Sequence, residues 1–100
     1  MAYKYRLSEE AELDVFESYI WYEKQKEGLG EEFLDTLDVA EQAITSNPLT
    51  YQIRYKKMVR AFVVDRFPYL VLYIVNGSNI DVIAVFNTNK HPDRWKKRLK

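Results

Sequence analysis

The spacing of hydrophobic residues changes once along the chain, at Asn47-Pro48, and this change limits the folds that are possible. Before it, apolar residues recur at helical spacing, and after it they alternate with polar residues or run together. The first pattern is typical of amphipathic helices and the second of strands. Proline also disfavours helical geometry in the residue before it, so a helix is expected to end here. The sequence therefore predicts helices followed by a sheet, an α+β fold.

Two helices are predicted before Pro48. Ser8 can cap the first, with Glu9 and Glu10 in the first turn, where the helix dipole favours negative charge. Gly28-Leu29-Gly30 ends this helix, and the second is predicted to begin at Glu31. Helices joined by so short a turn are expected to pack as an antiparallel hairpin. The spacing predicts buried stripes of Leu13, Phe16 and Ile20 in the first helix and of Phe33, Leu37, Ala40 and Ile44 in the second.

Strands are predicted on both sides of the helix pair. Residues 3–7 alternate aromatic or apolar with basic side chains, and residues 58–64, 69–75 and 80–86 form three further strands. Asn76-Gly77 tolerates the positive φ of a tight hairpin turn. We therefore expect a single domain over residues 1–100: an N-terminal strand, an antiparallel two-helix hairpin, and a three-stranded antiparallel sheet with the helices on one face. The other sheet face is expected to be open to a partner.

The composition excludes several kinds of site. The chain has no cysteine and one histidine, so neither a zinc site nor a disulfide is expected. Its three glycines do not form a phosphate-binding loop, and no serine lies in a nucleophile-elbow pattern. We therefore predict no metal and no cofactor. No apolar run approaches the roughly 18 residues of a membrane span, so a cytoplasmic protein without a membrane partner is expected.

The net charge of zero conceals an asymmetry between the two halves of the chain. Residues 1–50 contain 4 Lys/Arg and 12 Asp/Glu, whereas residues 51–100 contain 11 Lys/Arg and 3 Asp/Glu. The acidic residues of the first half can simply solvate the outer faces of the helices. The basic residues near the C-terminus can form one electropositive face.

Four groups of residues, in this order and spacing, resemble the ParE/RelE toxin superfamily, and together they span roughly residues 5–98. They are Trp21-Tyr22 with Gly28-Leu29-Gly30 and Phe33; Ile44 to Pro48; Arg60, seven residues ahead of Phe67-Pro68-Tyr69, with Tyr73; and Ala84-Val85-Phe86 leading to His91-Pro92, Trp95 and Arg98.

The resemblance implies a bacterial toxin of a type II toxin–antitoxin module, of the kind also called plasmid stabilisation proteins, which inhibits growth until a cognate antitoxin binds it. RelE-like members cleave messenger RNA on the ribosome without a metal, and ParE-like members inhibit DNA gyrase. A third possibility is a degenerate member that binds an antitoxin without being toxic.

Two positions depart from the pattern of the RelE-like nucleases. Leu70 stands where those enzymes tend to carry an arginine, and Trp95 resembles the position of their late tyrosine but cannot exchange a proton usefully. A nuclease would have to rely on Arg60, Lys90 and His91. His91 is either a general acid or base or an exposed loop residue, and Arg60 either faces a target or pairs with a helix carboxylate.

The neutral overall charge also favours the ParE-like alternative, because proteins that bind the ribosome gain affinity from phosphate neutralisation. We therefore expect a toxin that acts by binding, not an enzyme. Trp95 either docks back on the sheet or anchors a partner. The residues expected to contact the target or the antitoxin are Arg60, Lys90, Arg94, Trp95, Lys97 and Arg98.

Overall fold

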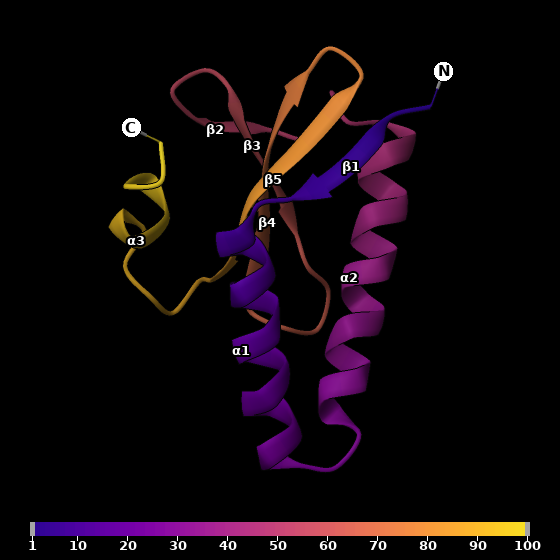
Figure 1. The fold of residues 1–100 in the computed structure, drawn as a ribbon, viewed down its shortest axis with the longest axis vertical. Helices are drawn as coiled ribbons and strands as arrows, with labels where there is room; N and C mark the ends of the chain where they lie inside the picture. Colours follow the sequence, from indigo (N-terminus) through magenta and orange to yellow (C-terminus); the bar gives the residue numbers. More distant parts are fainter. Residues whose placement is uncertain (1, 100) are drawn as a thin grey trace.

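The computed structural model describes residues 2–99 and confirms the α+β fold. The two long helices lie antiparallel on one face of a twisted sheet, and a short third helix lies on the other side (Figure 1). No helix among these residues is long and apolar enough to cross a membrane. The elements are β1 (Lys4–Leu7), α1 (Glu9–Gln25), α2 (Leu29–Ser46), β2 (Ile53–Tyr55), β3 (Val59–Val63), β4 (Tyr69–Asn76), β5 (Asn79–Asn87) and α3 (Asp93–Lys96).

The sheet has five strands in the order β1-β5-β4-β3-β2. The predicted antiparallel pairs β3–β4 and β4–β5 form its centre. The N-terminal strand β1 joins the same sheet, parallel to β5, so the sheet is mixed. Strand β2 was not predicted, because its three residues are too few to show an alternating pattern.

The buried side of α1 differs from the prediction. Leu13 and Phe16 are 54% and 60% exposed, whereas Ala11 is fully buried and Val15 and Tyr22 pack against the core. Helix α1 carries apolar residues on more than one face, so helical spacing alone could not identify the face that meets the sheet. The stripe of α2 is confirmed, since Phe33, Ala40 and Ile44 are fully buried and Leu37 packs against the core.

The turn between the helices depends on two glycines. Gly28 has a φ of 87°, in the left-handed region that glycine adopts without steric cost. A Cβ atom on Gly30 would lie 2.8 Å from the ring of Tyr19 and from the Glu23 carboxylate. That carboxylate accepts hydrogen bonds from the amides of Gly28 and Gly30, both at 2.9 Å, and so satisfies backbone donors at the start of α2.

Tyr73 on β4 joins the centre of the sheet to the end of α2. Its side chain is fully buried, and its hydroxyl donates a 2.7 Å hydrogen bond to the carbonyl of Pro48. Burial raises the pKa of Tyr73 to about 12, so the phenol stays protonated at neutral pH and remains a donor. The bond fixes the point at which the chain leaves the helical layer.

The sheet face opposite the long helices is covered by the chain itself. Val59, Ala61, Leu72, Ala84 and Phe86 form a second hydrophobic cluster on this face, and Trp95 of α3 packs on it with 5% of its surface exposed. The expectation that this face is open is therefore wrong over the area that α3 covers. Composition gave no sign of this, because residues 87–99 are polar and basic apart from Pro92, Trp95 and Leu99.

A tight turn at Tyr55–Met58, which we call the lysine turn, joins β2 and β3. The Met58 amide donates to the Tyr55 carbonyl at 3.1 Å, and Lys56 and Lys57 have φ values of 51° and 59°. Two central residues with positive φ are typical of a hairpin turn that usually contains Asn-Gly. This turn therefore holds two bulky side chains in a backbone conformation that costs them energy.

Replacing Tyr73 with phenylalanine removes the hydroxyl and leaves the Pro48 carbonyl without its partner. We expect Tyr73→Phe to lower the free energy of unfolding by about 1–2 kcal/mol in urea titrations. Tyr19→Phe is the control, because its hydroxyl bonds only the exposed Glu31 carboxylate. Equal stability of the Tyr73→Phe variant and the unmodified chain would contradict the role given to this bond.

Relieving the strain of the lysine turn should stabilise the fold. We expect Lys57→Gly to raise the free energy of unfolding by about 1 kcal/mol, because glycine adopts positive φ without a Cβ clash. The control is Lys24→Gly in the last turn of α1, where glycine is unfavourable and should destabilise the chain. A loss of stability in Lys57→Gly would show that the turn is not strained.

Candidate functional site

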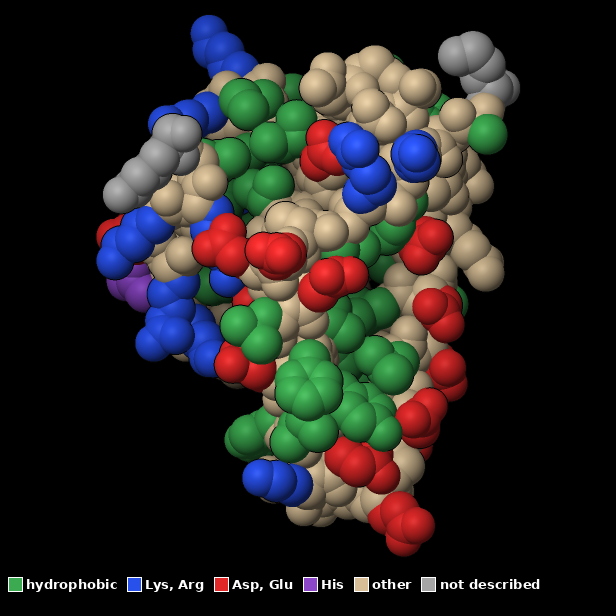
Figure 2. All heavy atoms as spheres, in the orientation of Figure 1, with side chains coloured by type: hydrophobic (Ala, Val, Ile, Leu, Met, Phe, Trp, Pro, Cys, Tyr) green, Lys and Arg blue, Asp and Glu red, His purple; other side chains and the backbone are tan. Residues whose placement is uncertain are grey.

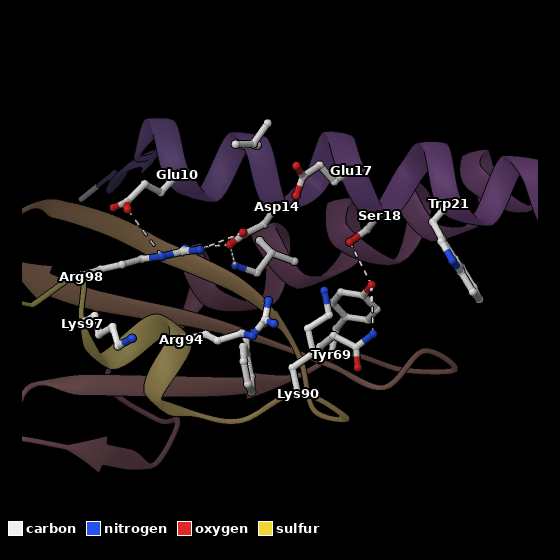
Figure 3. Close-up of a pocket in the computed structure, with 14 residues that line it drawn as sticks. Glu10, Asp14, Glu17, Ser18, Trp21, Tyr69, Lys90, Arg94, Lys97 and Arg98 are labelled. Carbon is white, nitrogen blue, oxygen red and sulfur yellow. Dashed lines mark hydrogen bonds and ion pairs between the residues drawn. The ribbon is translucent and has the colours of Figure 1, made fainter.

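A groove of about 890 Å³ runs between α1 and the C-terminal segment, and we call it the α1 groove. Figure 3 shows α1 along one side, the segment that carries Lys90 to Arg98 along the other, and Tyr69 between them. The lining residues are Glu10, Leu13, Asp14, Glu17, Ser18, Trp21, Tyr69, Val85, Phe86, Asn87, Lys90, Arg94, Lys97 and Arg98.

The α1 wall is a single face of the helix. Its residues follow at spacings of three and four, which places them on one side of an α-helix: Glu10, Leu13, Asp14, Glu17, Ser18 and Trp21. Leu13 and Trp21 are 54% and 58% exposed, so this wall offers apolar surface between its carboxylates. Such a mixed face suits a partner with both apolar and charged groups.

The opposite wall is cationic. Lys90, Arg94 and Lys97 are exposed and line the α1 groove, facing the carboxylate-bearing wall of α1 (Figure 3). Among residues 2–99, no carboxylate lies within ion-pair distance of these three side chains. Their charges are therefore available to a ligand in the groove.

One end of the α1 groove is closed by an ion pair between Arg98 and Asp14. The guanidinium donates to both carboxylate oxygens, at 2.8 and 2.9 Å, and to the carbonyl of Ile83 at 2.9 Å. Asp14 also accepts a 3.0 Å hydrogen bond from the amide of Val85. Both side chains are only 19% exposed, and the hydrogen bond to Asp14 raises the pKa of Arg98. This contact joins α1, β5 and the C-terminal segment.

Polar contacts fix the floor of the groove near its middle. The hydroxyl of Tyr69 donates to Ser18 Oγ at 2.9 Å, and the Asn87 side-chain amide donates to the Tyr69 oxygen at 3.4 Å. Tyr69 is buried, with 6% of its surface exposed, and its ring packs against Phe33 and Tyr22. The phenol thus holds α1 at a fixed distance from the sheet.

The three residues proposed for a nuclease do not line one site. Lys90 lines the α1 groove, but Arg60 and His91 do not. His91 is 73% exposed, and its Nδ1 accepts a hydrogen bond from the Asp93 amide. Arg60 donates to the carbonyls of Tyr51 and Leu49, at 2.7 and 3.1 Å. Arg60 pairs with no helix carboxylate among residues 2–99, so that alternative is wrong, and the alternative that it faces a target stays a prediction.

Two of the residues expected to contact a partner are held by contacts within the chain. Trp95 docks on the chain's own sheet, which is the first of the two alternatives considered for it, so its ring is not a free anchor. Arg98 is held by Asp14 and Ile83 and closes the groove. Lys90, Arg94 and Lys97 remain as exposed candidates.

The α1 wall was not predicted, although the sequence contains a signal for it. Leu13 was assigned to the buried stripe of the first helix, and Trp21 was named only among the residues that carry the resemblance. The spacing of Glu10, Asp14 and Glu17 with these two residues marks one helix face of mixed character. What the sequence does not contain is the position of residues 90–98, which depends on the docking of Trp95.

An exposed apolar patch extends from this wall across the helix hairpin. Figure 2 shows hydrophobic side chains gathered over the lower half of the two helices, surrounded by acidic ones. The exposed large apolar residues of these helices are Leu13, Phe16 and Trp21 of α1 and Val39 of α2, each more than half exposed. Contiguous apolar surface with a polar rim is typical of protein interaction sites.

The Asp14–Arg98 contact should determine whether the C-terminal segment stays docked. We expect Asp14→Asn to lower the free energy of unfolding by about 2 kcal/mol, because charge-assisted hydrogen bonds to Arg98 are lost. Trp95 fluorescence in a Trp21→Phe background reports the docking. The control is Asp81→Asn, which breaks the exposed pair with Arg6 and should cost less than about 1 kcal/mol. Similar losses in the two variants would contradict a special role for Asp14.

Comparisons with known proteins identify the fold. No model of a known protein family matches the sequence, and no curated protein matches it. Among solved structures, the chain is similar to one from the "Chromosomal ParDE TA system from P. aeruginosa", with a TM-score of 0.75, 14% identity, and coverage of 85% of this chain and 95% of that one. This chain therefore shares the fold of that chain of the ParDE system, which is the fold that the ParE/RelE resemblance implies.

Proposed function

We propose that this chain is the toxin of a type II toxin–antitoxin module, which inhibits growth by binding a protein target and is neutralised by a cognate antitoxin. DNA gyrase is the target that the ParE-like resemblance implies. The observation that carries the proposal is the fold shared with a chain of the ParDE system over 85% of the sequence.

The α1 groove supports binding of a polypeptide. Its volume of about 890 Å³ is open to solvent, and it combines carboxylates, free cations and the exposed side chains of Leu13 and Trp21. A polypeptide segment offers charges of both signs and apolar side chains at intervals that match such walls. In this proposal, Lys90, Arg94 and Lys97 bind acidic groups of the partner.

The positions of Arg60, Lys90 and His91 favour binding over RNA cleavage. Metal-free cleavage requires an acid, a base and a cation within reach of one phosphate. Arg60 is instead bonded to backbone carbonyls, and His91 lies outside the groove that contains Lys90. The cationic wall is thus placed where a partner can bind it. The three residues predicted for a nuclease do not lie together in one site.

The proposal is tested by induced expression in a bacterial host, alone and together with the gene adjacent to this one. Purified protein is then assayed for inhibition of gyrase supercoiling and, separately, for cleavage of messenger RNA on ribosomes. We expect growth arrest that the neighbouring gene relieves, gyrase inhibition, and intact messages. Ribosome-dependent cleavage lost in His91→Ala and Lys90→Ala would contradict the proposal and establish a nuclease. If growth continues in a host with an intact gyrase, toxicity is contradicted and antitoxin binding is the function that remains.

The role of the cationic wall has its own test. We expect the triple variant Lys90→Ala, Arg94→Ala and Lys97→Ala to inhibit gyrase at least about tenfold less, because charged contacts across an interface contribute strongly to association. The control removes the same charge elsewhere, with Lys4→Ala, Lys24→Ala and Lys26→Ala, and should inhibit as the unmodified chain does. Equal inhibition by both triple variants would exclude the groove as the target site.

A further inference from the structure

A second cationic surface lies outside the α1 groove, and neither the sequence motifs nor the proposed function accounts for it. It consists of Lys56 and Lys57 of the lysine turn and Lys96 of α3, and we call it the lysine surface. None of these three residues lines the groove. Figure 1 shows that the β2–β3 connection extends beyond the sheet on the side where α3 lies.

The ring of Tyr55 brings two of these lysines together. Lys96 Nζ lies 4.9 Å and Lys56 Nζ 5.6 Å from the centre of this ring, within the range of cation–π attraction. The Tyr55 ring in turn meets Trp95 edge to face, with ring centres 5.3 Å apart. The docking of α3 therefore places a lysine from one element next to the lysine turn of another, against their mutual repulsion.

The lysine surface has no neutralising acid nearby. Among residues 2–99, no carboxylate lies within 4.0 Å of the three ammonium groups, whereas Arg6 and Arg66 each have one and Arg98 has two. In the view of Figure 2, Lys and Arg side chains gather along the edge formed by α3 and the β2–β3 connection, and Asp and Glu side chains cover the long helices. Like charges are thus concentrated at one side of a chain whose net charge is zero.

The backbone conformation of the lysine turn is energetically unfavourable for the two lysines that it contains. Lys56 and Lys57 both have positive φ, which Asn-Gly would adopt more easily in the same turn. Lysine gives this turn no ion pair within the described residues that would offset the strain. Within the fold, Lys56 gains only the contact of its ammonium group with the Tyr55 ring, and strained residues of this kind cluster at functional sites.

We propose that the lysine surface binds the phosphate backbone of a nucleic-acid duplex. Lysine presents a mobile point charge suited to phosphate oxygens, and two lysines on a projecting turn with a third beside them on α3 can follow a line of phosphates. The ring of Tyr55 is occupied by two ammonium groups and by Trp95, so it orients the cations and does not stack on a base. Recognition is therefore of backbone charge and not of sequence. This activity goes beyond the proposed function, which uses the α1 groove.

The test measures binding to fluorescently labelled DNA and RNA duplexes of the same sequence by fluorescence anisotropy, over a range of salt concentrations. The decisive variant is Lys56→Asn with Lys57→Gly, which removes two charges and installs residues that fit the turn. We expect it to bind at least about tenfold more weakly at low salt, and its slope of log affinity against log salt to be shallower by about 1.8. Because Asn-Gly suits positive φ, a thermal melt should show a fold at least as stable.

The matched control is Lys24→Gln with Lys26→Gln at the far end of α1, which removes the same charge from exposed positions. We expect it to bind as the unmodified chain does. Binding to DNA, to RNA or to both supports the proposal and identifies the source of the phosphates. The proposal is overturned if the unmodified chain binds neither duplex, if the control loses as much affinity as the turn variant, or if polyglutamate competes as well as unlabelled duplex. Gyrase inhibition is measured separately, so loss of duplex binding and failure of the proposed function are distinguishable.

Discussion

The arrangement of this molecule depends on the hydrogen bonds that the Asp14 carboxylate accepts. It accepts hydrogen bonds from the Val85 amide on β5 and from the Arg98 guanidinium, and so joins the first helix, an inner strand and the C-terminal segment. Asp14 is mostly shielded from water, where charge-assisted hydrogen bonds are stronger than on an open surface. Through Arg98 it ties the C-terminal wall of the α1 groove directly to the α1 wall.

The second constraint is that both faces of the sheet must be covered by a chain of 100 residues. The helix hairpin covers one face, and Trp95 with its neighbours covers part of the other. A short helix of four residues has little stability of its own, so it depends on the burial of one large aromatic ring. That burial has a further effect, because it orients Arg94 and Lys97 toward the groove and Lys96 toward Tyr55.

The sequence predicted the parts of this structure that follow from local patterns. Helix α2, the strands β3 to β5 and the hairpin at Asn76-Gly77 have regular spacing or characteristic turn residues, and they lie where expected. The sequence did not predict the features that long-range packing determines. Helix α1 has apolar residues on several faces, and only contact with the sheet selects Ala11 over Leu13. For the same reason, the α1 wall of the site was not predicted, although four of its cations were and the docking of Trp95 was one of two alternatives.

The separation of acids and bases across the fold has a consequence for how this molecule meets others. Acidic side chains cover the long helices, and basic ones gather around α3 and the β2–β3 connection (Figure 2), so a chain with no net charge is a strong electric dipole. The electric field of a charged partner orients such a molecule before the two come into contact. Its rate of association should therefore fall with ionic strength although its net charge is zero, and it should be retained by both anion and cation exchangers at low salt.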